Sequence, residues 1–106
     1  MTIKVFKFGG ASVKDAEGLK NVATILRKYK DEKIVIVVSA MGKTTNALEE
    51  VVKSFYNGDT NTLNLINQIK ENHFKLINEL FEANKDVVDD INDTFVEIEW
   101  LLDEKP

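Results

Sequence analysis

A lysine and two glycines stand together at the end of the first apolar segment, in a pattern that suits phosphate binding. Lys7 precedes Gly9 and Gly10, and Ser12 follows them. Glycine has no Cβ, so the backbone can approach a ligand closely and can turn successive N–H groups into an anion-binding concavity. The pattern is neither a Walker A loop, whose lysine follows the glycines, nor a dinucleotide fingerprint. The same residues would also make a simple turn beside a surface lysine, so a second feature must decide.

A second turn with similar chemistry follows the next apolar segment. Residues 34–38 are five consecutive β-branched residues, which is typical of a strand that is buried on both faces. Small and hydroxyl-bearing residues come directly after it, including Ser39, Gly42 and Thr45. Ser39 and Thr45 either bind a ligand or serve only as turn and capping residues. Lys43 is better explained as a solvated side chain.

The elements that position these two turns follow from the hydrophobic spacing. An apolar strand is expected to end at Phe8, and a helix is expected over residues 15–29, with Ser12 and Asp15 forming a start that resembles a capping box. Strand, helix and strand in this order predict a parallel βαβ unit. The carboxyl ends of parallel strands lie at one edge of a sheet, so both turns should line one crevice there.

Helical spacing continues through the rest of the chain. A helix is expected over residues 45–56. Two longer stripes, over about 60–83 and, after Asn84-Lys85, from Val88 to Leu102, predict an αα-hairpin. Trp100 lies off the main stripe and is expected to contact a part of the protein outside the hairpin or a partner. The predicted fold class is α/β, a parallel sheet with flanking helices and a C-terminal αα-hairpin. The predicted division is a βαβα phosphate-site unit over residues 1–59 and an acidic helical hairpin over residues 60–106.

Composition narrows the class of protein. The chain has 106 residues, 43% hydrophobic content, no cysteine and a net charge of −4, which argues against disulfides, thiolate metal sites and general binding of nucleic acid. Residues 1–60 hold ten Lys/Arg against seven Asp/Glu, whereas residues 61–106 hold four against eleven. A basic first part suits a phosphorylated ligand. No segment has the length or character of a membrane span or signal peptide, so the expected location is the cytoplasm and no membrane partner is expected.

Two further groups could do chemistry but are better explained by structure. His73 is the one histidine and lies within an apolar helical stripe, where a packed helix residue is far commoner than a catalyst. The four aspartates of residues 86–93 lack the glycine and terminal glutamate of a calcium loop, and acidic residues favour the first turns of a helix. No metal ligand is assigned.

The segments Lys7-Phe8-Gly9-Gly10-Ala11-Ser12-Val13 and Val37-Val38-Ser39-Ala40-Met41-Gly42-Lys43-Thr44-Thr45-Asn46 closely resemble the N-terminal part of aspartate kinases, in the amino-acid kinase superfamily. The first segment alone also resembles other members, including glutamate 5-kinase. The resemblance implies the start of the three-layer fold of that superfamily. It also implies transfer of the γ-phosphoryl group of ATP, bound with Mg²⁺, to the β-carboxylate of L-aspartate, the first step toward lysine, threonine and methionine.

The resemblance also implies roles for single residues. Lys7 would be the catalytic, phosphate-contacting lysine, Phe8, Gly9 and Gly10 would bind the nucleotide, and Ser39 and Thr45 would help to hold aspartate. Ala11 stands where many members carry threonine. The family's acidic substrate-binding residue, its aspartate-binding arginine, its adenine-binding segment and its regulatory ACT domains come later than residue 106. The chain is therefore expected to be an N-terminal fragment without turnover of its own.

Two other functions stay open from the residues alone. One is a stand-alone module that binds an anion and docks a partner through its acidic hairpin, and the other is an αβ domain whose turns bind nothing. Two parallel strands with few helices also leave sheet edges and apolar faces exposed. Self-association as a homo-oligomer, most simply a dimer, is therefore expected.

Overall fold

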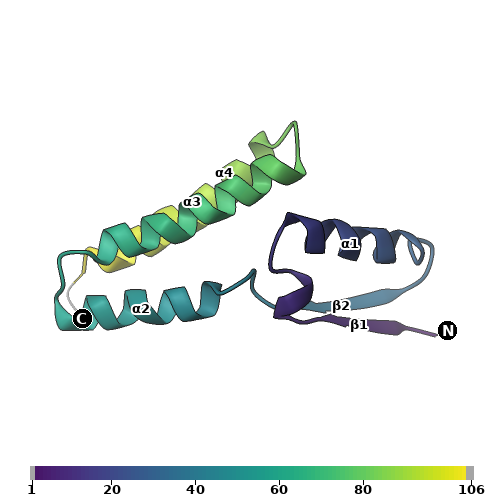
Figure 1. Cartoon of the computed structure of the whole chain (residues 1–106), viewed down its shortest axis with the longest axis horizontal. Coiled ribbons are helices and arrows are strands. Elements are labelled where there is room, and N and C mark those ends of the chain that lie inside the picture. The colour runs from purple at the N-terminus through teal and green to yellow at the C-terminus, as the bar shows by residue number, and fades with distance from the viewer. Residues whose placement is uncertain (1, 105–106) are drawn as a thin grey trace. The chain divides into compact units, whose positions relative to one another are not determined.

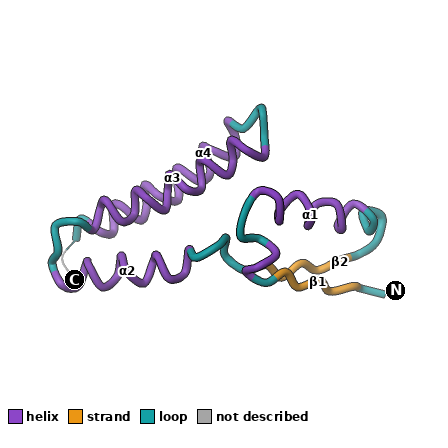
Figure 2. The backbone as a smooth tube through the Cα atoms, viewed as in Figure 1, coloured by secondary structure: helices purple, strands orange, loops and turns teal. Residues whose placement is uncertain are grey.

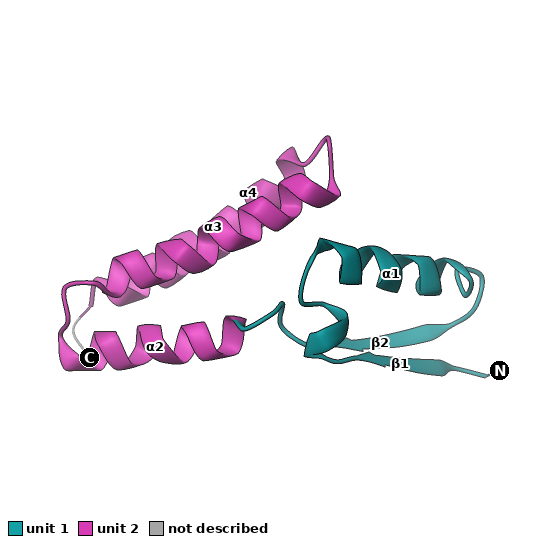
Figure 3. Ribbon diagram, viewed as in Figure 1, with its two compact units in different colours: residues 1–43 teal, residues 44–106 magenta. Residues whose placement is uncertain are grey.

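The computed structural model describes residues 2–104. Packing divides the chain into two compact units, residues 1–43 and residues 44–106 (Figure 3), and each is described by itself below. The first contains both strands and one helix, and the second is wholly helical. The fold class is thus α/β with a parallel sheet, flanking helices and a helical hairpin, as predicted.

The first unit is a βαβ unit built on a two-stranded parallel sheet. Strand β1 (Lys4–Phe8) leads through a short 3-10 turn (Gly10–Ser12) into helix α1 (Ala16–Arg27), and strand β2 (Ile34–Val38) returns beside β1 (Figures 1 and 2). The strands pair residue by residue from Lys4 with Ile34 to the carboxyl ends, where Phe8 pairs with Val38.

The two faces of strand β1 differ in what covers them. Phe6 and Phe8 stack at a centroid distance of 6.3 Å and pack with the apolar residues of α1, around a core of Phe8, Val13 and Val22. Side chains alternate along a strand, so Val5 and its register partner Val35 lie on the opposite face. Val5 is 67% exposed and Val35 is 47% exposed.

On the α1 side of β2, Ile36 is 45% exposed and Val38 is 57% exposed. The expectation that β2 is buried on both faces therefore fails on both faces within this unit, because the cluster that α1 forms with the sheet contains Phe6 and Phe8 of β1.

Helix α1 begins at a different residue from the one expected. Asp15 is the N-cap, and its Oδ1 accepts a hydrogen bond from the N–H of Gly18 at 2.8 Å, whereas Ser12 belongs to the preceding 3-10 turn. A Cβ on Gly18 would lie 2.5 Å from the carbonyl oxygen of Ser12. The absence of a Cβ at Gly18 thus allows the 3-10 turn to pack closely against the first turn of α1. Glycine also lowers the helix propensity of α1 at this position.

An ion pair lies at the other end of the sheet. Lys4 Nζ is 2.8 Å from a carboxylate oxygen of Glu32 and lies 4.7 Å from the centroid of the Tyr29 ring. The hydrogen bond to Glu32 raises the pKa of Lys4 above its usual value. Both side chains are 44% exposed, so the pair contributes little to stability.

The second unit consists of helices α2 (Thr44–Asn57), α3 (Thr62–Leu80) and α4 (Lys85–Leu102). Helices α2 and α4 both pack against α3, and α3 and α4 form the predicted αα-hairpin (Figures 1 and 3). The core of the unit comprises buried residues from all three helices: Val51, Ile66, Ile69 and Phe95. Because Val51 of α2 packs in this core, packing joins α2 to the hairpin, whereas the predicted division grouped it with the strands.

His73 and the aspartates behave as ordinary helix residues. His73 Nδ1 lies 2.8 Å from the carbonyl oxygen of Ile69, and its ring packs edge to face on Phe95 at 5.7 Å. Asp86, Asp89, Asp90 and Asp93 are exposed. Within residues 2–104 no group of three or more His, Cys, Asp or Glu side chains could hold a metal ion. Over the same residues, no helix is both long enough and apolar enough to cross a membrane.

A buried polar contact joins α2 to the start of α3. The hydroxyls of Ser54 and Thr62 are 2.6 Å apart and buried, and Ser54 Oγ also donates to Asn61 Oδ1 at 3.0 Å. Each buried hydroxyl thus has a partner, which avoids the cost of an unsatisfied polar group.

Replacing Ser54 by alanine is expected to lower the free energy of unfolding of the second unit by about 1 to 2 kcal/mol. The substitution removes the hydroxyl partner of both Thr62 and Asn61, and Thr62 then keeps its longer bond to the Asp59 carbonyl, at 3.3 Å. Urea unfolding followed by far-UV circular dichroism measures this change.

Thr94 provides a matched control, since Thr94 is exposed and its hydroxyl donates to the Asp90 carbonyl of its own helix at 3.3 Å. Thr94→Ala is expected to change stability by less than about 0.5 kcal/mol. Equal effects of the two substitutions would contradict the interpretation.

Candidate functional site

The carboxyl ends of β1 and β2 lie side by side. Phe8 and Val38 are register partners, and the N–H of Ser39 donates to the Phe8 carbonyl at 3.0 Å. Gly9 and Ser39 therefore leave the sheet at the same edge, as the parallel pairing predicted.

The second turn also contacts the segment that follows the first. Gly42 has φ of +52°, in the left-handed region that glycine adopts at no steric cost. A Cβ at Gly42 would lie 3.4 Å from the carbonyl oxygen of Lys14. The two turns are thus neighbours along one edge of the sheet.

The glycine turn is held by a buried residue on each side. Phe8 is 7% exposed and Val13 is 2% exposed, so the core of the first unit anchors both ends. Inside the turn, Ser12 donates to the Gly9 carbonyl at 3.0 Å and Val13 donates to the Gly10 carbonyl at 3.3 Å. The side chain of Phe8 is committed to the core, so Phe8 positions the turn.

The open side of the turn can accept an anion. The N–H groups of Gly10 and Ala11 precede the first internal hydrogen bond of the 3-10 turn, and such N–H groups at the start of a helical turn are free to bind a ligand. A Cβ at Gly9 or Gly10 would meet no atom within 4 Å. The backbone is therefore approachable at both glycines.

Lys7 carries a positive charge and directly precedes Phe8, the buried residue at the start of the glycine turn. Its register partner is Val37, and by strand alternation it lies on the sheet face opposite α1. The side chain is exposed, and within the described part of the chain no carboxylate forms an ion pair with it. Its charge is consequently available to a ligand at this edge.

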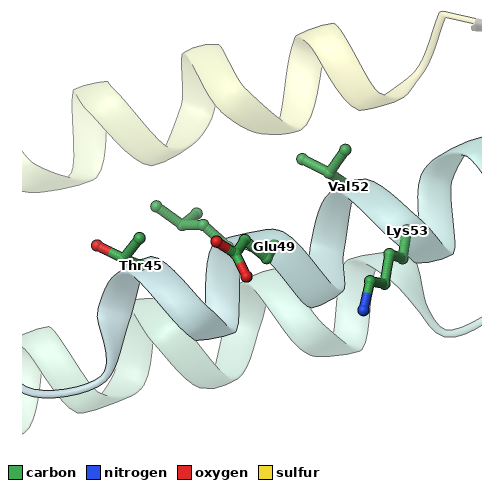
Figure 4. A pocket seen from close by; sticks show the side chains of 5 residues that line it. Thr45, Glu49, Val52 and Lys53 are labelled. Atoms are coloured by element: carbon green, nitrogen blue, oxygen red, sulfur yellow. The ribbon is translucent and has the colours of Figure 1, made fainter.

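The two predicted aspartate-binding residues fall in different units. Ser39 is exposed at the edge of the sheet, next to the glycine turn. Thr45 lies in the first turn of α2, where it lines a shallow groove with Leu48, Glu49, Val52 and Lys53 (Figure 4). The structure thus brings together Lys7, Phe8, Gly9, Gly10 and Ser39, while Thr45 is part of the second unit. Lys43 is exposed, as expected for a solvated lysine.

A hollow of about 310 Å³ in the second unit has the opposite charge character. It is lined in part by the carboxylates Asp59, Asp103 and Glu104. Such a lining repels phosphate, so the glycine turn is the better phosphate site of the two.

Two residues that support the turn were not recognised as such from the sequence. Asp15 caps α1, and an aspartate directly before a helical stripe is itself an N-cap signal. The packing of Gly42 against Lys14 has no such local signal, because the two residues are 28 positions apart and meet only through the parallel pairing.

The sequence profile described as the amino acid kinase family matches residues 2–97 of this chain. The chain belongs to the amino acid kinase family. The match spans both turns and most of the helical second unit, so the family assignment does not depend on the glycine turn alone.

Within the amino acid kinase family, the chain is similar to aspartokinases. "Aspartokinase 2, chloroplastic" of Arabidopsis thaliana is 46% identical over 79 residues, which are 72% of this chain and 14% of that protein. "Aspartokinase 2" of Bacillus subtilis (strain 168) is 45% identical over 56 residues, which are 51% of this chain and 14% of that protein. The matched part of the chain thus spans 14% of the length of each of these curated relatives. The resemblance to the N-terminal part of aspartate kinases is confirmed.

Proposed function

We propose that this chain forms part of an aspartate kinase, which transfers the γ-phosphoryl group of ATP to the β-carboxylate of L-aspartate at the start of lysine, threonine and methionine synthesis. The observation that carries the proposal is the pairing of Phe8 with Val38, which puts the glycine turn, Lys7 and Ser39 at one sheet edge. The names of the aspartokinase relatives support the choice of substrate.

Phosphoryl transfer to a carboxylate requires positive charge near the transferred phosphoryl group and correct positioning of the reactants more than it requires a general base. The β-carboxylate of aspartate is already ionised at neutral pH, so it can attack directly. A bond forms between a carboxylate oxygen and the γ-phosphorus, the bond from that phosphorus to the β,γ-bridging oxygen breaks, and ADP leaves. The transition state spreads negative charge over the transferred oxygens. Lys7 and the N–H groups of Gly10 and Ala11 are the groups of this chain that would stabilise that charge.

The remaining roles follow from the same proposal. Phe8, Gly9 and Gly10 would shape the nucleotide site, and Ser39 and Thr45 would hold aspartate. Residues 1–59 would form the phosphate-site part of the catalytic domain and residues 60–106 its acidic helical part, with the adenine-binding segment and ACT domains elsewhere in the protein. The described residues do not fit a resident metal site. Mg²⁺ would therefore arrive bound to ATP.

The decisive test is the reaction itself. The full-length kinase is expected to form an acyl phosphate from ATP and L-aspartate, trapped with hydroxylamine as the hydroxamate, and to leave L-glutamate unreacted. Formation of the glutamate product instead would overturn the substrate assignment.

The purified 106-residue chain is expected to show no turnover in the same assay, because the resemblance implies that the adenine-binding segment and the aspartate-binding arginine come after residue 106. Detectable aspartyl phosphate from this chain alone would refute the assignment of essential residues to the part of the protein after residue 106.

The location of the protein in the cell stays a prediction. The Arabidopsis relatives are named chloroplastic, whereas the location expected from the sequence is the cytoplasm.

A further inference from the structure

The turn that follows β2 is attached at both ends to the segment that contains the glycine turn. We call residues 39–42 the Ser39 turn. At its start, the N–H of Ser39 donates to the Phe8 carbonyl at 3.0 Å. At its end, Gly42 lies against the backbone of Lys14, whose carbonyl oxygen would be 3.4 Å from a Cβ at Gly42. Phe8 and Lys14 stand on the two sides of the glycine turn, so both attachments, which lie within the first unit, fix where the Ser39 turn runs.

Gly42 makes its attachment in a backbone conformation that few other residues adopt. Its φ is +52°, in the left-handed region, which strains an ordinary L-residue but which asparagine tolerates better than most. Space is not the constraint, because a Cβ at 3.4 Å from the Lys14 oxygen would make an ordinary van der Waals contact. The effect of a substitution at residue 42 is therefore set by the backbone conformation and not by the volume of the side chain.

We propose that Gly42 is a positioning residue for the acceptor substrate: its left-handed conformation keeps the Ser39 turn beside the glycine turn, and so keeps the Ser39 hydroxyl at the aspartate site. This role of Gly42 rests on the proposed function, in which Ser39 helps to hold aspartate. If only a fraction of the molecules has the Ser39 turn in place, the affinity for aspartate falls by that fraction. The glycine turn keeps its own buried anchors, Phe8 and Val13, so binding of ATP does not depend on residue 42.

Two substitutions at residue 42 of the full-length kinase test this role. Gly42→Ala is expected to raise KM for aspartate about tenfold, since the left-handed region is disfavoured for alanine by about that factor. Gly42→Asn is expected to raise it less than about threefold, because asparagine accepts this region more readily. In both variants kcat and KM for ATP are expected to stay within about twofold of the wild type. Asparagine is larger than alanine, so a greater loss in Gly42→Asn than in Gly42→Ala would overturn the explanation through the backbone.

Gly58→Ala is the matched control. Gly58 also has a positive φ, +71°, and a Cβ there would meet no atom within 4 Å, but it lies in the turn between α2 and α3. Both alanine variants are expected to lower the melting temperature, because alanine strains a left-handed position. Only Gly42→Ala is expected to raise KM for aspartate. An equal rise in Gly58→Ala would show a general effect of lost stability and would overturn the assignment to Gly42.

A double-mutant cycle with Ser39→Ala tests whether Gly42 acts through Ser39. Ser39→Ala alone is expected to raise KM for aspartate. In the Ser39→Ala background, Gly42→Ala is expected to raise it by less than a further twofold or so, because the hydroxyl that Gly42 positions is already absent. Full additivity of the two effects, or a Ser39→Ala variant with an unchanged KM for aspartate, would overturn the proposal.

The same assays separate the failure of this role from the failure of the proposed function. A wild-type kinase that forms no aspartyl phosphate would refute the proposed function. An active wild type whose Gly42→Ala variant keeps its KM for aspartate would refute only the role of Gly42. An equal rise of KM for ATP and KM for aspartate in Gly42→Ala would refute the assignment to the Ser39 turn, because the glycine turn would then have moved as well.

Discussion

Replacing Lys7 by alanine in the full-length kinase is expected to lower kcat for aspartyl phosphate formation by about 100-fold or more, which is the usual loss when one preorganised contact to the developing charge is removed. Lys7 lies next to the anchored glycine turn, and no carboxylate of the described residues competes for its charge. Steady-state kinetics of ADP release at saturating aspartate measure the effect. A rise in KM for ATP with kcat unchanged would mean that Lys7 only binds the nucleotide.

Lys20→Ala is the matched control for Lys7→Ala. Lys20 is also an exposed lysine of the first unit, but it lies on α1, so its removal changes the net charge by the same amount without touching the sheet edge. Its kcat is expected to stay within about twofold of the wild type, because a distant exposed charge is screened by salt. If Lys7→Ala behaved in the same way, Lys7 would have no part in the mechanism.

Replacing Ile66 by alanine is expected to lower the free energy of unfolding of the second unit by about 3 kcal/mol. Ile66 is 0% exposed and packs in the core shared by all three helices, and truncation of a buried isoleucine leaves a cavity that costs about 2 to 5 kcal/mol. The higher helix propensity of alanine offsets only a few tenths of a kcal/mol. Urea unfolding followed by far-UV circular dichroism measures the loss, because three of the four α-helices belong to this unit.

Leu63→Ala provides the comparison on the same helix. Leu63 lies in the first turn of α3 and is 51% exposed, so its truncation is expected to cost less than about 1 kcal/mol. A large loss at Leu63 with a small loss at Ile66 would contradict the packing described for α3.

The local sequence pattern was enough to predict most of the helices and strands. The five β-branched residues predicted β2 with its observed bounds, and helical spacing predicted α2, α3 and α4 to within a few residues. Helix α1 was predicted two residues too long at its end, because Tyr29 continues the apolar spacing but packs on Phe6, at 4.9 Å between ring centroids, from outside the helix. Its start was predicted at residue 15, with Ser12 and Asp15 as a pair that resembles a capping box, and only the geometry of the turn selects Asp15 as the N-cap.

The positions of the candidate residues were predictable to a similar degree, whereas their roles stay a prediction. Lys7, Gly9, Gly10 and Ser39 were chosen because glycines and hydroxyls follow two strands, and parallel pairing then requires the strand ends to meet.

Burial was not predictable in the same way. The run of β-branched residues in β2 indicates a doubly covered strand, but cover depends on which elements pack on each face, and Ile36 and Val38 on the α1 side are exposed like Val35 and Val37.

The amino-acid sequence by itself therefore determined the order and type of the elements and the chemistry of the two turns, because propensity, spacing and the absence of a Cβ are local properties of the chain. Only the tertiary structure decided that α2 packs with the hairpin through Val51, that Gly42 contacts Lys14 and that β2 is exposed on both faces within the first unit. These features depend on contacts between residues far apart in the chain, and the free energy of such contacts is set by packing, which no local pattern encodes.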